Sequence, residues 1–244
     1  MKEKTVALLV FNGVDELDLA IWGVFGVWKR VYNGPNALLV VSQDGKPVTC
    51  ANGMKLGAHH SFQNLPKTNY LIVPGGQGTR HEDKNQELLL FVKKQFLSCE
   101  NILSVCTGSF LLAAAGILEN KESTTHWLSL TRLKEEYPKT AVVQKRIVTA
   151  GKIMMSSGMT AGIDLGLEFI SRAAKEEVAA RIQRHMEYFP CHVYGKISEH
   201  AMYLGYLTQV ENHHKPSSLV VAGMFCEKNR PDVNNEKLLL QSNL

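Results

Sequence analysis

Residues 101–110, NILSVCTGSF, join a short apolar run directly to a series of small and polar residues. The run from Ile102 to Val105 predicts a strand that is buried on both faces, and residues 107–116 predict a helix that ends in glycine. Cys106 falls on the turn between them, where its side chain leaves the sheet and faces the first free N–H groups of the helix. This geometry is that of a nucleophile elbow.

The position of Cys106 predicts an activated thiol. Free N–H groups and the helix dipole stabilise a thiolate, so we expect the pKa of Cys106 to lie below its usual value of about 8.5. A buried structural cysteine fits the same local pattern, because free cysteines are among the most buried residues. The stretch alone leaves both interpretations open, and the rest of the chain must decide between them.

Strands and helices alternate along the chain. The predicted strands are Thr5–Phe11, Ala37–Val41, Asn69–Val73 and Ile102–Val105, with a hairpin of Arg146–Thr149 and Ile153–Ser156. The predicted helices are Glu16–Val31, Asn85–Leu97, Thr107–Gly116, His126–Glu135, Thr160–Arg172 and Lys175–Tyr188. Apolar strands separated by helices predict an α/β fold with a mainly parallel sheet and helices on both faces. Ligands of such folds bind beyond the carboxyl ends of the strands.

The composition narrows the class of protein. A chain of 244 residues with 45% hydrophobic content buries one substantial core, and its net charge of +4 is too small to indicate nucleic acid or membrane binding. No apolar run reaches the ~20 residues of a membrane helix, and the N-terminal run lacks a signal-peptide cleavage site. Five scattered cysteines without a Cys-x-x-Cys pair predict a reduced, cytoplasmic protein.

The character of the sequence changes after Pro190. We therefore predict an α/β domain over residues 1–190 and a C-terminal extension over residues 191–244. The extension contains scattered histidines and an apolar run, and it ends in a polar segment that we expect to be mobile. Its sequence does not indicate its role.

A thiolate nucleophile needs donors for a developing negative charge. The strand Asn69–Val73 ends in Pro74-Gly75-Gly76, and a glycine pair leaves its backbone N–H groups open to a ligand. The N–H groups of Gly76 and Thr107 are candidates for a two-donor oxyanion hole. An ordinary strand-to-loop turn is the alternative interpretation of the two glycines.

The nucleophile also needs a group that moves protons. Asp15, Glu16 and Asp18 follow the first strand, near the predicted carboxyl edge of the sheet. Such residues are usually helix caps, but Asp18 lies between two leucines, which predicts a partly buried carboxyl with a raised pKa. His126 is the candidate histidine partner of Cys106, or else a cap or a packing group. The histidines show no metal-binding spacing, so we expect no metal ion.

Four segments resemble the ThiJ/PfpI superfamily, in the order of that family: Val14–Leu19, Leu71–Thr79, the elbow at Cys106, and Ser156–Leu165. Together they fall within roughly residues 4–188. The resemblance implies a flavodoxin-like α/β sandwich, also described as a glutamine amidotransferase-like fold, and a homodimer.

Within that superfamily, three segments are most similar to the isonitrile hydratase branch and to the ligand domains of AraC-type regulators: residues 105–109, 124–127 and 160–164. This resemblance implies that Cys106 is the nucleophile, that Asp18 hydrogen-bonds it, and that Thr107 and the Gly76 backbone assist. The peptidase-like and glyoxalase branches usually place histidine directly after the cysteine. Thr107 stands there in this chain, which argues against a catalytic Cys–His pair.

AraC-type regulators add roughly a hundred residues of basic helix-turn-helix domain. Residues 176–244 are fewer and carry nearly equal numbers of acidic and basic side chains, so we do not expect DNA binding.

The sequence therefore predicts a hydro-lyase that converts a small isonitrile to an N-formamide without a cofactor. Trp22, Trp127 and Met159 are candidates to line an apolar pocket. One alternative is a glyoxalase or deglycase acting on methylglyoxal, with His126 as the base. The other is a non-catalytic redox sensor or ligand-binding protein in which Cys106 becomes a sulfinic acid that Asp18 stabilises.

Overall fold

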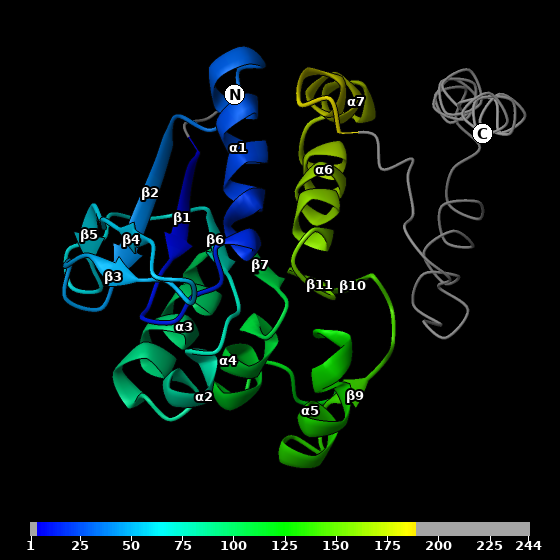
Figure 1. Cartoon of the computed structure of the whole chain (residues 1–244). Coiled ribbons are helices and arrows are strands. Elements are labelled where there is room, and N and C mark those ends of the chain that lie inside the picture. The colour runs from blue at the N-terminus through cyan, green and yellow to red at the C-terminus, as the bar shows by residue number, and fades with distance from the viewer. Residues whose placement is uncertain (1–3, 189–244) are drawn as a thin grey trace, which may run out of the picture. The chain divides into compact units, whose positions relative to one another are not determined.

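The computed structural model of this chain describes residues 4–188 (Figure 1). The predicted extension over residues 191–244 lies outside the described residues.

A seven-stranded sheet forms the centre of the described part, in the order β10-β11-β7-β6-β1-β2-β5. Its strands are β1 (Thr5–Leu9), β2 (Ala37–Ser42), β5 (His60–Ser61), β6 (Tyr70–Val73), β7 (Asn101–Val105), β10 (Ile147–Ala150) and β11 (Ile153–Ser156). Two small pairs of strands lie outside this sheet: β3 (Val48–Thr49) with β4 (Lys55–Leu56), and β8 (Glu122–Ser123) with β9 (Ala141–Val142).

The six strands from β5 to β11 in the sheet order pair in parallel, and only β10 runs antiparallel to its neighbour β11. Val6 of β1 stands between Leu38 of β2 and Tyr70 of β6, and Ile102 of β7 stands between Leu71 and Ile153. Every residue of β6 and β11 is buried. Parallel strands of this kind are buried because helices cover both faces of the sheet.

The helices form two groups (Figure 1). Mutual contacts group α1 (Ala20–Val31) with α6 (Ala161–Ala173) and α7 (Glu176–His185), and group α4 (Gly108–Ala114) with α2 (Thr79–Glu82) and α3 (Gln86–Ser98). A helix α5 (Leu130–Glu136) follows a short 3₁₀ turn, Trp127–Ser129. The predicted fold class, a flavodoxin-like α/β sandwich with a mainly parallel sheet, is confirmed.

Most predicted elements are present, with shifted ends. The helix predicted over Glu16–Val31 begins with a 3₁₀ turn, Leu17–Leu19, before α1, and the helix predicted over His126–Glu135 is the 3₁₀ turn followed by α5. The antiparallel hairpin of β10 and β11 is confirmed. The two-residue strands and the four-residue helix α2 were not predicted, because elements this short carry no periodicity.

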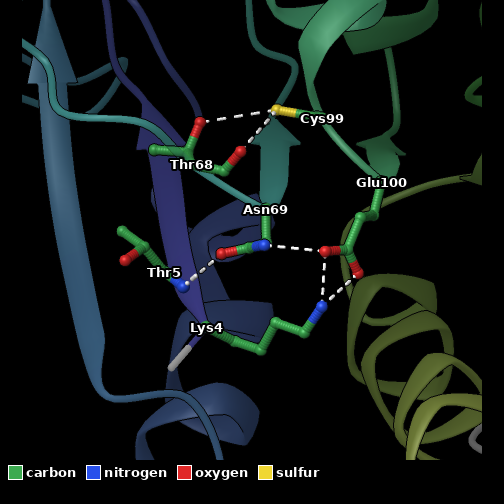
Figure 2. A network of polar contacts seen from close by, with 6 residues as sticks. All are labelled: Lys4, Thr5, Thr68, Asn69, Cys99 and Glu100. Carbon is green, nitrogen blue, oxygen red and sulfur yellow. Dashed lines mark hydrogen bonds and ion pairs between the residues drawn. The ribbon is translucent and has the colours of Figure 1, made fainter. Parts of the chain in front are cut away.

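A polar network lies at the amino-terminal end of the central strands (Figure 2). Asn69 accepts a hydrogen bond from the Thr5 N–H at 2.9 Å and donates one to Glu100 at 2.7 Å, while Lys4 pairs with Glu100. The sulfur of Cys99 lies 3.4 Å from the Thr68 hydroxyl. These contacts hold together the starts of β1, β6 and β7, at the end of the sheet opposite to Cys106.

Within residues 4–188, no helix is both long enough and apolar enough to cross a bilayer. The three cysteines in this part of the chain, Cys50, Cys99 and Cys106, are all free.

Candidate active site

Cys106 is the first residue of the two-residue turn, Cys106-Thr107, between the end of β7 at Val105 and the beginning of α4 at Gly108. Its φ is +57°, in the left-handed region that residues with a Cβ seldom adopt. Holding a non-glycine residue there costs about 1–3 kcal/mol, so the surrounding structure must impose it. The Cys106 N–H donates to the carbonyl of Ser156 on the neighbouring strand β11 at 3.1 Å, which fixes one side of the turn.

Two buried hydroxyls fix the other side of the turn. Thr125 Oγ1 donates to the Cys106 carbonyl at 3.0 Å, and Ser109 Oγ donates to the same oxygen at 3.2 Å. Both side chains are completely buried. The strained backbone of Cys106 is therefore held by hydrogen bonds at its N–H and at its carbonyl.

Asp18 brings a carboxyl group to Cys106. It lies in the 3₁₀ turn ahead of α1 and is completely buried. The N–H of Gly75 donates to Asp18 Oδ2 at 2.8 Å, the N–H of Met159 donates to Oδ1 at 3.1 Å, and the carboxyl lies close enough to the Cys106 side chain to interact with it. Segments that follow β1, β6, β7 and β11 thus meet at one point, as expected for the carboxyl edge of a parallel sheet.

Burial raises the pKa of Asp18 to about 7. The hydrogen bonds from Gly75 and Met159 favour the charged form and oppose this rise, while the charge of Asp15 adds to it. Burial is the larger effect because the carboxylate has lost its water. Near neutral pH the carboxyl is therefore present in both protonation states, which suits a group that both gives and takes a proton.

The predicted low pKa of Cys106 is wrong. Burial and the nearby charge of Asp18 raise the pKa of this thiol to about 12, although the N–H groups of Thr107 and Met159 favour the thiolate. The side chain is only 6% exposed. The prediction counted the helix N–H groups but not the loss of solvent, and loss of solvent has the larger effect here. The free protein holds Cys106 as a neutral thiol.

The glycine turn lies against the elbow. A Cβ on Gly75 would stand 2.5 Å from the Thr107 nitrogen and 2.8 Å from Asp18 Oδ2, so only glycine fits. The N–H of Gly76 is not left free: it donates to Thr107 Oγ1 at 2.9 Å, and that hydroxyl lies 3.2 Å from the Gly76 carbonyl. A role for Gly76 as an oxyanion donor therefore requires the Thr107 hydroxyl to turn away first.

His126 lies beside the site rather than against the sulfur. Its ring borders Gly158, where an added Cβ would stand 2.8 Å from the ring carbon Cδ2. Its Nδ1 accepts from the Leu128 N–H at 3.4 Å, and burial lowers its pKa. Among the described residues, no hydrogen bond joins His126 to Cys106. The cap that the sequence offered as an alternative describes His126 best.

The other two acidic residues have structural contacts. Asp15 Oδ1 accepts from the Leu17 N–H at 2.9 Å, and Glu16 accepts hydrogen bonds from Asn52 at distances down to 2.8 Å. Of the acidic cluster, only Asp18 reaches the thiol.

The three candidate pocket residues fall into two classes. Trp127 and Met159 are 47% and 37% exposed, and both belong to the segments that border His126 and Asp18. Trp22 instead packs against the hydrophobic core. Within residues 4–188 no cluster of three or more metal-binding side chains is present.

Comparison with known proteins identifies the family. The model of the DJ-1/PfpI family matches residues 4–172, which is more than half of the chain. The chain belongs to the DJ-1/PfpI family. The resemblance to the ThiJ/PfpI superfamily predicted from the four segments is confirmed.

Members of the DJ-1/PfpI family that resemble this chain differ in their descriptions. The isonitrile hydratase of Pseudomonas putida is 31% identical over 188 residues, which cover 76% of this chain and 78% of the hydratase. The transcriptional regulator CdhR of Pseudomonas aeruginosa is 31% identical over 143 residues, covering 59% of this chain but 42% of the regulator. Proteins that resemble this chain therefore include both an enzyme and a transcriptional regulator.

A solved structure supports the same fold. A ThiJ/PfpI family protein from Pseudomonas syringae superposes with a TM-score of 0.73 at 25% identity, covering 87% of this chain and 88% of that protein.

Two features of the site were not predicted. The sequence drew attention to His126, whereas the preceding Thr125 contacts the elbow, and the backbone N–H of Met159 contacts Asp18. Thr125 was one of the quoted residues of the resembling segment, and this was the only signal for it. Met159 adopts a φ of +39°, which no local pattern indicates.

The contacts of Thr125 predict a loss of stability in Thr125→Val. This change keeps the shape of the side chain but removes the donor to the Cys106 carbonyl, so we expect the free energy of unfolding to fall by about 1–2 kcal/mol. Thr125→Ser keeps the hydroxyl and should lose less. Urea unfolding of the three proteins measures the difference, and equal losses in the two variants would contradict a role for the hydrogen bond.

Proposed function

We propose that this protein hydrates isonitriles to N-substituted formamides, with Cys106 as nucleophile and Asp18 as proton carrier. The observation that carries the proposal is the buried Asp18 carboxyl, which lies beside the Cys106 thiol and interacts with it. A carboxyl with a pKa of about 7 gives and takes protons near neutral pH, and a thiol beside it needs such a partner.

The chemistry of isonitriles suits a neutral thiol. The terminal carbon of R–N≡C accepts a nucleophile and a proton at the same atom. In the first step the sulfur and the proton of the Cys106 thiol therefore both add to that carbon. Asp18 takes the thiol proton and passes it to the carbon, which forms the thioimidate R–N=CH–S–Cys106. A high thiol pKa is compatible with this step because the proton moves as the sulfur attacks.

The second step uses water alone as co-reactant. Water adds to the thioimidate carbon with Asp18 as the base, and the resulting tetrahedral adduct expels the sulfur as it regains its proton. The products are R–NH–CHO and the free thiol of Cys106. The N–H groups of Thr107 and Met159, both of which interact with the Cys106 sulfur, are placed to stabilise charge on it when it leaves.

The surroundings of the thiol fit a slim, apolar substrate. Cys106 is only 6% exposed, and the linear end of an isonitrile is among the narrowest electrophilic groups. The exposed side chains of Trp127 and Met159 offer apolar surface for the group R.

The comparisons support this proposal over glyoxal chemistry. The isonitrile hydratase aligns with about three quarters of this chain. A glyoxalase or deglycase mechanism based on His126 lacks a hydrogen bond between that histidine and Cys106 in the described residues, so Asp18 would have to act as the base.

Turnover of an aryl isonitrile, followed by absorbance, tests the proposal. We expect formamide to accumulate with the wild type, and we expect Asp18→Ala to lower kcat by about 10²–10⁴-fold, the usual contribution of a general acid or base. His126→Gln is the matched control, because it removes the neighbouring titratable group and should keep most of the activity.

A folded wild type that produces no formamide would contradict the proposed hydration. Production of D-lactate from methylglyoxal by the same sample would then favour glyoxalase chemistry, and uptake of oxygen atoms by Cys106 in mild peroxide would favour redox sensing. The homodimer and the cytoplasmic location remain predictions, which sedimentation and cell fractionation measure.

A further inference from the structure

The loop of residues 157–160 between β11 and α6 carries a donor that two groups of the active site share. The Met159 N–H donates to Asp18 Oδ1 at 3.1 Å and also interacts with the Cys106 sulfur. Met159 has a φ of +39°, in the left-handed region that a residue with a Cβ seldom adopts. Such a backbone persists only where its surroundings impose it, so contacts outside the loop must hold Met159 in place.

Arg146 fixes both ends of this loop. At the beginning, the Ser157 N–H donates to the Arg146 carbonyl at 2.9 Å. At the end, the Arg146 guanidinium forms an ion pair with Asp164 in the first turn of α6, and its Nε donates to Asp164 Oδ2 at 2.7 Å. The two side chains are 22% and 16% exposed, so water and salt screen this pair less than a pair on the surface. A single residue therefore ties the end of β11 to the beginning of α6.

The segment of Arg146 also borders the other side of the elbow. The carbonyl of the preceding Lys145 accepts a hydrogen bond from the completely buried Thr124 at 2.8 Å. Thr124 is followed by Thr125, which holds the Cys106 carbonyl. Residues 145–146 thus join the segment that fixes the Cys106 backbone to the loop that contacts its side chain. The position of that loop relative to Cys106 therefore depends on Arg146.

We propose that Arg146 and Asp164 are positioning residues: their ion pair sets the position of the Met159 N–H in the active site. They act through the loop and not on the reacting atoms. The Met159 N–H favours the charged forms of both Asp18 and Cys106, so a displaced loop makes the carboxyl harder to ionise and the thiol less reactive. The effect on isonitrile turnover rests on the proposed function, whereas the effect on the Asp18 carboxyl does not.

Titration of the Asp18 carboxyl, followed by NMR of the carboxyl carbons in protein labelled at aspartate, tests the positioning role. The Asp18→Asn spectrum identifies the signal. Arg146→Gln and Asp164→Asn should each move the midpoint of this titration from about 7 to higher pH, by about one unit, because the carboxylate loses a hydrogen bond. Three other titratable groups surround this part of the site and are unchanged in both variants: Asp15, Cys106 and His126.

The two variants separate positioning from a direct effect of charge. Arg146→Gln removes a positive charge and Asp164→Asn removes a negative one, so a direct electrostatic effect would move the Asp18 midpoint in opposite directions. Loss of the positioned N–H raises the midpoint in both. A midpoint that is unchanged in both variants, or that falls in Asp164→Asn, would overturn the proposal.

Arg172→Gln is the matched control. Arg172 also belongs to α6, pairs with Glu168 at 2.7 Å and donates to Thr149 of β10 at 3.3 Å, but it lies at the opposite end of the helix from the loop. We expect the wild-type midpoint in this variant, and an equal rise there would overturn the positioning role. Thermal unfolding identifies any variant that fails to fold. Arg146→Lys keeps the positive charge and, as the milder variant, should raise the midpoint less.

Isonitrile turnover provides a second readout. We expect kcat to fall by about tenfold or more in Arg146→Gln and Asp164→Asn with little change in KM, since neither side chain binds substrate. An unchanged kcat in both variants, with an active wild type, would overturn the role of the pair in turnover. A wild type without turnover would contradict the proposed function, while a raised Asp18 midpoint in the two variants would still support the positioning role.

Discussion

Cys106→Ser is expected to abolish isonitrile turnover, with a loss of at least about 10⁴-fold in kcat, as is typical when a covalent nucleophile is removed. The serine hydroxyl has nearly the shape of the thiol but gives up its proton far less readily. The strained backbone, the hydrogen bonds at its carbonyl and the Asp18 carboxyl would all remain in place. The measurement is the rate of formamide formation at matched protein concentration, with circular dichroism to verify the fold.

Cys99→Ser is the matched control for that experiment. Cys99 is also a buried, free cysteine, but it belongs to the polar network at the opposite end of the sheet (Figure 2). A serine there keeps a donor for the neighbouring Thr68 carbonyl. We expect this variant to retain most of the wild-type rate. Substantial turnover by Cys106→Ser would show that the sulfur is not the nucleophile.

Asp18→Asn is expected to change how the stability of the protein depends on pH. The pKa of Asp18 is raised from 3.8 to about 7 in the folded protein, which corresponds to about 4 kcal/mol of folding free energy. A raised pKa in the folded state means that this stabilisation is fully present below about pH 4 and is lost as the pH rises through 7. Asparagine cannot ionise, so the variant does not lose stability in this way as the pH rises.

The quantity to compare is therefore the difference in free energy of unfolding between the wild type and Asp18→Asn. Relative to the wild type, Asp18→Asn should gain about 4 kcal/mol in free energy of unfolding between pH 4 and pH 8. Its absolute stability also reflects the fit of the amide to the N–H groups of Gly75 and Met159, so the change with pH is the quantity to measure. Urea unfolding at several pH values gives it. A difference that stays constant with pH would show that Asp18 ionises normally.

Much of the site follows from the order of elements in the chain. Cys106 directly follows β7, and Asp18 lies in the segment that connects β1 to α1. Both were predicted because segments that follow parallel strands lie at the carboxyl edge of the sheet. The leucines around Asp18 predicted its burial, and the structure shows that the burial is complete. These inferences needed only the alternation of apolar and polar residues, which is a local property.

The state of charge at the site did not follow in the same way. The pKa of Cys106 was predicted to fall and is instead raised, because it depends on how much water reaches the sulfur and on the distance to the Asp18 charge. Both quantities are set by segments far apart in the chain. The same reason explains Gly76, whose N–H was predicted to be open and is hydrogen-bonded to Thr107.

The sequence by itself determined the parallel α/β fold, the cysteine at the end of β7 and the acid that follows β1. These features depend on apolar periodicity and on the alternation of strands and helices along the chain, which can be read from neighbouring residues. Only the tertiary structure decided which groups hydrogen-bond one another: Thr125 with the Cys106 carbonyl, the Met159 N–H with Asp18, and the Gly76 N–H with the Thr107 hydroxyl. Hydrogen bonds and desolvation depend on distances of a few ångströms between distant segments, and no local pattern encodes those distances.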